Sequence, residues 1–233
     1  MDLAIVIFLL GGLFLGWSLG SNDAANVFGT AVGTRMVRFK TAAIVCSLFI
    51  ILGAVISGSG TTETLGKLGA INALPGAFAA CVAAGLSVYI MTKFGLPVST
   101  TQAIVGAIVG WNLYTGSSTN IKVLLTILST WILCPIIAAL IAMLFFILTK
   151  KLLKNTTWHI LRLDAYTRTA LLIAGAFGAY SLGANNIANV MGVFVPITPF
   201  ADIQLGSFLT FSSKEQLFLI GGIAIAAGVF TYS

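Results

Sequence analysis

The sequence predicts an all-α, polytopic membrane protein built as an inverted repeat, with broken helices and half-helix N-termini at the midplane of the bilayer. Three observations predict this fold. Of the 233 residues, 58% are hydrophobic and only 8% are charged, whereas a soluble domain carries roughly 25% charged residues. Apolar runs of membrane-spanning length follow one another along the chain. A polar motif near the N-terminus occurs a second time, 163 positions later.

Seven apolar runs are candidates for membrane segments, because each is close to or longer than the roughly 20 residues that a spanning helix needs. They cover residues 3–34, 41–57, 75–92, 95–113, 121–149, 168–197 and 217–231. The first run contains the polar stretch 18–23. A straight helix over the whole run would measure ~48 Å, against a hydrocarbon core of ~30 Å. We therefore expect this helix to tilt strongly or to break at the polar stretch, and the sixth run is interrupted in the same way.

Basic residues set the predicted orientation. The chain has 12 Lys and Arg against 6 Asp and Glu, and in a membrane protein such an excess marks cytoplasmic loops rather than a nucleic-acid surface. One basic cluster lies at 35–40 and another at 150–168. If both are cytoplasmic, the run 95–113 must cross as a unit and the N-terminus is external. The expected organisation is a first repeat at 1–149, a cytoplasmic basic loop at 150–167 and the start of an inverted second repeat at 168–233, in a multi-pass protein of the cell membrane.

The repeated motif is the strongest internal signal. Residues 18–29 read SLGSNDAANVFG and residues 181–192 read SLGANNIANVMG, with eight of twelve positions identical. The first copy runs toward one basic cluster and the second copy runs away from the other, so the two copies cross the membrane in opposite directions. Inverted repeats with polar, glycine-interrupted helices at matching positions are typical of secondary transporters. The sequence thus indicates an alternating-access carrier and not an enzyme.

Asp23 is the only acidic residue at depth in the first interrupted run. A carboxylate within the bilayer costs about 2.5 kcal/mol or more, so it should face a cavity or a cation. Na⁺ or a proton would be its natural partner, and the amide oxygens of Asn22 and Asn26 suit a hard cation. Asn185 and Asn189 hold the matching positions of the second copy. Plain interhelical hydrogen bonding is the alternative for these asparagines.

The segment 95–102, GLPVSTTQ, predicts the start of a helix. Its proline ends any preceding helix, and S-x-x-Q is the spacing of a capping box, so a helix should begin near Ser99. The free N–H groups and positive dipole end of such a helix attract anions, and Ser99, Thr100 and Thr101 add hydroxyl donors. The segment is either an oxyanion site or a plain capping box. Glu63, in a segment expected to be external, is either a gate or recognition residue or a solvated loop acid.

Three segments resemble a known family. GSNDAANVFGTAVGT (20–34), LPVSTTQAIVGAIVG (96–110) and GANNIANVMG (183–192) are similar to signature segments of the inorganic phosphate transporter (PiT) family. The resemblance implies a homodimeric symporter of inorganic phosphate in the lipid bilayer. Na⁺ is the expected coupling ion, with H⁺ the alternative, and no further cofactor or nucleic-acid partner is expected. A carrier of sulfate or another oxyanion on the same scaffold, or an uncoupled oxyanion channel, also fits the motifs.

The resemblance also implies roles for individual residues. Those expected around the cation are Asn22, Asp23, Asn26, Asn185 and Asn189; those expected to bind phosphate are Asn26, Ser99, Thr100, Thr101 and Asn189; and Glu63 is the candidate gate. One departure is that the second copy reads Asn185-Asn186 where the family often has Asn-Asp, which lowers the negative charge near the substrate. A second copy of the 99–102 segment would fall near position 262, so we expect this chain to be an N-terminal portion with an incomplete second repeat.

Overall fold

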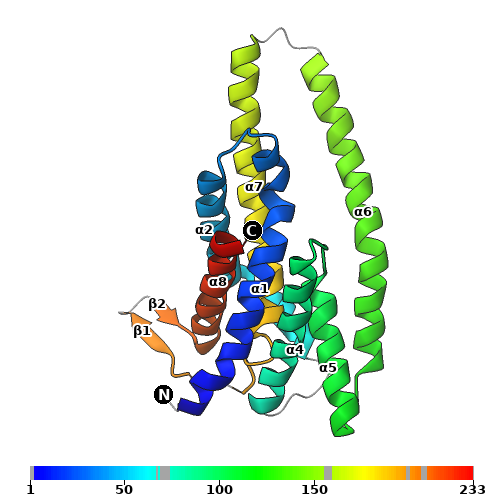
Figure 1. The fold of residues 1–233 in the computed structure, drawn as a ribbon, viewed down its shortest axis with the longest axis vertical. Helices are drawn as coiled ribbons and strands as arrows, with labels where there is room; N and C mark the ends of the chain where they lie inside the picture. The colour runs from blue at the N-terminus through cyan, green and yellow to red at the C-terminus, as the bar shows by residue number, and fades with distance from the viewer. Residues whose placement is uncertain are drawn as a thin grey trace.

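The computed structural model describes residues 3–66, 68, 74–154, 159–197, 200–205 and 209–232. Apart from one short hairpin, its regular elements are helices (Figure 1). In chain order they are α1 (Leu3–Gly33), α2 (Phe39–Ser57), α3 (Ser59–Gly66), α4 (Leu74–Lys93), α5 (Thr100–Thr115), α6 (Ile121–Lys154), α7 (Ile160–Met191), β1 (Ile203–Leu205), β2 (Leu209–Phe211) and α8 (Ser213–Tyr232). β1 and β2 pair antiparallel, with Ile203 opposite Phe211, and no sequence pattern predicted this hairpin.

Six described helices are long and apolar enough to cross a membrane, namely α1, α2, α4, α6, α7 and α8. The polytopic all-α fold is therefore confirmed. The run 95–113, predicted as a seventh span, forms α5, and its 16 residues measure only ~24 Å against a core of ~30 Å. Figure 1 shows α4 and α5 side by side and antiparallel, so together they return the chain to the side from which α4 starts. The orientation of α6 therefore does not require α5 to cross as a unit.

Both copies of the repeated motif lie inside unbroken helices. α1 and α7 continue through the polar residues, so the predicted breaks in these two helices are wrong. Polar side chains need not open a helix, because they can bond to their neighbours from its surface; the Ser21 hydroxyl donates to the carbonyl oxygen of Ser18 at 2.7 Å. Figure 1 shows α1 inclined to α7, which agrees with tilt, the alternative to a break that the sequence left open.

The predicted cytoplasmic loop at 150–167 is mostly helical, because α6 and α7 extend into it from both sides. Charged residues mark where a helix leaves the apolar core without ending it. An i,i+4 ion pair joins Arg168 Nε to Asp164 Oδ2 at 2.7 Å and supports the first turns of α7. Arg168 Nη1 also donates to the carbonyl oxygen of Met36 at 2.8 Å. This contact brings the segments of the two basic clusters to the same end of the molecule.

α1 packs against α4 and α8, and its contact with α8 is a backbone contact at glycines. A side chain at Gly20 would overlap the carbonyl oxygen of Ile225, and one at Gly228 would overlap the carbonyl oxygen of Trp17. Small residues at helix crossings in membranes allow this close approach. The first motif copy is thereby fixed against the last helix of the chain.

The second motif copy repeats the same pair of contacts. α7 crosses α2 where Gly183 lies against the carbonyl oxygen of Ile50 and Gly53 lies against that of Tyr180. The α7 positions follow the α1 positions by 163 residues in both cases, and the α8 positions follow the α2 positions by 175 residues. Each motif helix therefore crosses a helix from the other half of the chain in the same way.

Candidate functional site

The start of α5 agrees with the capping prediction. Ser99 has an extended backbone and its hydroxyl accepts a hydrogen bond from the Gln102 N–H at 3.3 Å. The N–H of Val98 donates to Asn22 Oδ1 across 3.5 Å. Because Asn22 lies well inside α1, the N-terminal end of α5 lies beside the middle of a membrane-length helix, where its positive dipole end is effective.

A polar cavity of about 410 Å³ lies at this helix start. Its lining residues are Asp23 and Asn26 of α1, Pro97 to Thr101 at the start of α5, and Leu182 and Asn186 of α7. Asp23 is the one ionisable side chain among them. Thr100 is 2% exposed, and its hydroxyl has no hydrogen-bond partner among the described residues. A buried hydroxyl without a partner costs about 1–3 kcal/mol, so a ligand with acceptor oxygens would find a ready donor here.

A second polar cavity, of about 560 Å³, adjoins the first, because Ser99 and Thr101 line both. It lies among α3, α5, α6 and α7. The other polar or aromatic residues that line it are Thr61, Gln102, Thr130, Trp131, Asn185 and Asn189, together with Cys134. The hydroxyls at the start of α5 thus separate two polar spaces, one beside α1 and one beside α6.

Two of the predicted ligand asparagines hold the α4–α5 pair instead of lining the first cavity. Asn22 Nδ2 donates to Thr92 Oγ1 at 2.8 Å, and Asn22 is absent from the lining of both polar cavities. Asn189 Nδ2 donates to Thr101 Oγ1 at 2.9 Å. These two amides thus make hydrogen bonds between elements, the alternative that the sequence left open, and their role as ligands stays a prediction. Asn26 and Asn185 line the first and second cavity respectively.

Glu63 belongs to α3, but its side chain lies outside the described part of the structure, so its role as a gate stays a prediction. The segment around it is a helix rather than the expected loop. Thr61 of this helix donates to the Ala184 carbonyl oxygen at 3.1 Å and lines the second cavity, and no sequence signal marked it. Asn186, which stood out in the sequence only as a departure from the family pattern, lines the first cavity; its i,i+3 spacing to Asn189 places both on one helix face.

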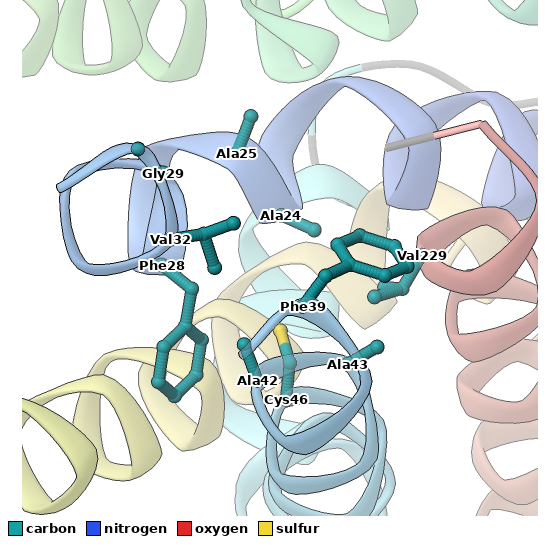
Figure 2. A pocket seen from close by; sticks show the side chains of 11 residues that line it. Ala24, Ala25, Phe28, Gly29, Val32, Phe39, Ala42, Ala43, Cys46 and Val229 are labelled. Carbon is teal, nitrogen blue, oxygen red and sulfur yellow. The ribbon is translucent and has the colours of Figure 1, made fainter. Parts of the chain in front are cut away.

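The first motif copy has an apolar face as well as a polar one. Ala24, Ala25, Phe28 and Gly29 line an apolar pocket of about 280 Å³ between α1 and α2, which Val229 of α8 also lines. Figure 2 shows these side chains with Phe39, Ala42, Ala43 and Cys46 of α2. The polar groups of the motif, Asp23 and Asn26, instead line the cavity at α5. The motif is therefore amphipathic and presents its ionisable group to one space only.

Membrane-length helices around polar cavities, with a carboxylate and a helix N-terminus beside one of them, are typical of membrane transport proteins. A model described as the phosphate transporter family matches residues 19–233. The chain belongs to this family, which consists of transporters and not of enzymes. The resemblance drawn from the three signature segments is therefore confirmed.

Relatives and a solved structure agree with this assignment. A protein of Thermococcus kodakarensis named "Putative phosphate permease" is 38% identical over 166 residues, which are 66% of this chain and 41% of the relative. One of the same name from Methanocaldococcus jannaschii is 27% identical over 233 residues, 100% of this chain and 68% of the relative. A structure described as "The sodium-dependent phosphate transporter" has the same fold, with a TM-score of 0.74 and 24% identity over 98% of this chain and 75% of that one. The chain spans about two fifths of the length of the Thermococcus relative.

Proposed function

We propose that the chain forms part of a symporter that couples inorganic phosphate to Na⁺ and works by alternating access. One observation carries the proposal: a single cavity is lined by a carboxylate and an amide of α1 and by the hydroxyls at the start of α5. Carboxylate and amide oxygens are ligands for a hard cation. Hydroxyls and free N–H groups at a helix start are donors for an oxyanion.

Charge balance in this cavity explains why the substrates would move together. No Lys, Arg or His is among its lining residues, and the dipole of α5 supplies only about half a positive charge. Two like charges ~5 Å apart at an effective dielectric constant of ~20 repel by roughly 3 kcal/mol. Phosphate beside the ionised Asp23 meets such a repulsion, and one bound Na⁺ offsets it. Phosphate therefore binds well only when the cation is present.

The proposed roles follow the cavity linings. Asp23 and Asn26 bind Na⁺, with the Asn185 amide in the adjoining cavity as a further cation ligand. Ser99, Thr100 and Thr101 bind phosphate. Asn22 and Asn189 act by holding the α4–α5 pair against α1 and α7, to which they bond from one motif copy each. Alternating access is supported by the opposite directions of α1 and α7 in Figure 1, because the start of α5 is hydrogen-bonded to both helices, through Val98 and Thr101.

Uptake into liposomes tests the proposal. The reconstituted protein should accumulate radiolabelled phosphate under an inward Na⁺ gradient and not in choline medium. Asp23→Asn should abolish Na⁺-driven uptake. Asp164→Asn is the matched control, because Asp164 belongs to an exposed i,i+4 pair of α7 and such pairs contribute only a few tenths of a kcal/mol. Equal uptake in Na⁺ and choline, or uptake driven by a proton gradient alone, would reject sodium coupling.

The placement in the cell membrane is part of the same proposal, with the N-terminus external and two copies in a homodimer. The contact of Arg168 with Met36 supports a common side for both basic clusters, which the positive-inside rule assigns to the cytoplasm. Labelling of single cysteines introduced near Arg35 and Lys150, with an impermeant reagent on intact cells, tests the orientation. Labelling at either site from outside would contradict it. Cross-linking in membranes, read as a shift to twice the monomer mass, tests the dimer.

A further inference from the structure

A small hydrogen-bond network joins α7 to α5 at the cavity. Asn189 Nδ2 donates both to Thr101 Oγ1 and to Asn186 Oδ1, each at 2.9 Å. Asn189 is 4% exposed. One amide nitrogen carries two hydrogens, so this network uses the full donor capacity of Asn189.

The network determines which hydrogen-bond donors of Asn186 and Thr101 remain unused. A threonine hydroxyl that accepts one hydrogen bond keeps its own hydrogen for another acceptor. An asparagine whose oxygen is engaged keeps its amide hydrogens. Among the described residues, no further hydrogen bond is made by the side chain of Asn186 or Thr101, and both residues line the 410 Å³ cavity. The cavity therefore receives an amide donor from α7 and a hydroxyl donor from α5.

Thr100 of α5 lines this cavity too. Its hydroxyl is buried and has no partner among the described residues. Donors thus converge on one space from two helices that are remote in sequence. The N–H and O–H groups of such neutral side chains match the acceptor oxygens of an oxyanion.

Equivalent positions of the repeat place different chemical groups on the two sides of the cavity. Asn186 is the counterpart of Asp23, since the two positions differ by the repeat offset of 163. The same motif position therefore presents a carboxylate from α1 and an amide from α7 to one cavity. An ionised carboxylate can only accept hydrogen bonds, whereas the nitrogen of an amide donates them.

We propose that Asn186 is an oxyanion-binding residue, which donates from Nδ2 to the same inorganic phosphate that the α5 hydroxyls hold. The two motif copies thereby have different roles: Asp23 of the first copy binds the cation, and Asn186 of the second copy binds the anion. Asn189 presents the donors of Asn186 and Thr101 to the substrate. This inference rests on the proposed phosphate site, and it adds a ligand from the second copy to that site.

Equilibrium binding of radiolabelled phosphate to the purified full chain in Na⁺ buffer tests the inference. Asn186→Asp keeps the shape and the acceptor for Asn189 but replaces the donor by a charged oxygen, and we expect phosphate affinity to fall by about tenfold or more. Asn186→Ser restores a donor, and its affinity should stay closer to that of the wild type. Asn120→Asp is the matched control, because Asn120 accepts from the Val123 N–H at the start of α6, outside both cavities.

The possible outcomes distinguish a failure of the Asn186 inference from a failure of the proposed phosphate site. Wild-type protein that binds phosphate, together with unchanged or tighter binding by Asn186→Asp, overturns the role of Asn186 and leaves the phosphate site standing. Wild-type protein that does not bind phosphate overturns both. Should Asn186→Asp fail to fold, Asn186→Leu and Asn186→Ser carry the test, since only Leu lacks a donor. Equal affinity of these two variants would also overturn the inference.

Discussion

Gly53 of α2 lies directly against the backbone carbonyl oxygen of Tyr180 of α7. The reciprocal contact, between Gly183 and the carbonyl oxygen of Ile50, lies on the same crossing. Main chains this close leave no room for any side chain at the two glycines. The crossing fixes α7, and therefore Asn186 and the network it belongs to, relative to the rest of the bundle.

Gly53→Ala is expected to destabilise the protein, because the new Cβ overlaps the Tyr180 carbonyl oxygen and the helices must move apart. Overpacking of this kind typically costs 1–3 kcal/mol. The measurement is the unfolding temperature of the purified protein in detergent, followed by tryptophan fluorescence. Gly106→Ala in α5 is the control: apart from its chain neighbours and the backbone of its own helix, no atom lies within 4 Å of a Cβ placed there, and the gain in helix propensity should leave or raise the unfolding temperature. Equal unfolding temperatures for both variants would contradict the contact.

The features that sequence reasoning predicted correctly are local ones. The start of α5 depends on a proline, a capping serine and an apolar run within a few residues, and Ser99 caps the helix as expected. Six of the seven apolar runs likewise form helices long enough to cross a membrane, whereas the run 95–113 forms the shorter helix α5. The glycine of the motif, Gly20, could be recognised as unusual, but its partner on α8 could not, because the pairing depends on how distant helices cross.

Which asparagine lines the cavity and which one bonds to the α4–α5 pair could not be predicted for the same reason. Asn22 and Asn26 are one helical turn apart, so periodicity places them on the same face of α1. Only Asn26 lines the cavity, while Asn22 bonds to Thr92. What separates them is the position at which the α4–α5 pair packs along α1. That position is a property of the tertiary structure and cannot be predicted from the residues of the motif.

Two substitutions of Ser99 are expected to affect protein stability and phosphate affinity differently. Ser99→Ala removes the cap of α5 and should cost about 1 kcal/mol, read as a lower unfolding temperature. Ser99→Asp keeps a capping oxygen and favours the helix dipole, so its unfolding temperature should match the wild type. Its carboxylate occupies the phosphate site, and phosphate affinity should drop by more than about tenfold because like charges repel at short range. Wild-type affinity in Ser99→Asp would show that the substrate binds elsewhere.

Cys134 should report on the second cavity. Cys46 and Cys81 are buried, whereas Cys134 is exposed and lines the cavity that contains Ser99 and Thr101. A water-soluble, negatively charged methanethiosulfonate should therefore modify Cys134 first and weaken phosphate binding, because the added charge repels the anion. Mass spectrometry of the intact protein counts the modifications. Cys134→Ala should bind phosphate and resist the reagent, and the same loss of binding in this variant would contradict the assignment.

Asn22 is predicted to hold the linker between α4 and α5 against α1. Its oxygen accepts from the Val98 N–H and its nitrogen donates to Thr92 Oγ1. Asn22→Leu removes both bonds and keeps the number and branching of the side-chain heavy atoms. Hydrogen exchange of the Val98 amide should become faster, because this amide then has no partner from α1. Asn26→Leu is the control, since Asn26 lies one turn further along α1 and makes no bond to the linker in the described structure. Slow exchange at Val98 in both variants would show that packing of the α4–α5 pair, and not the Asn22 amide, positions the start of α5 in the cavity.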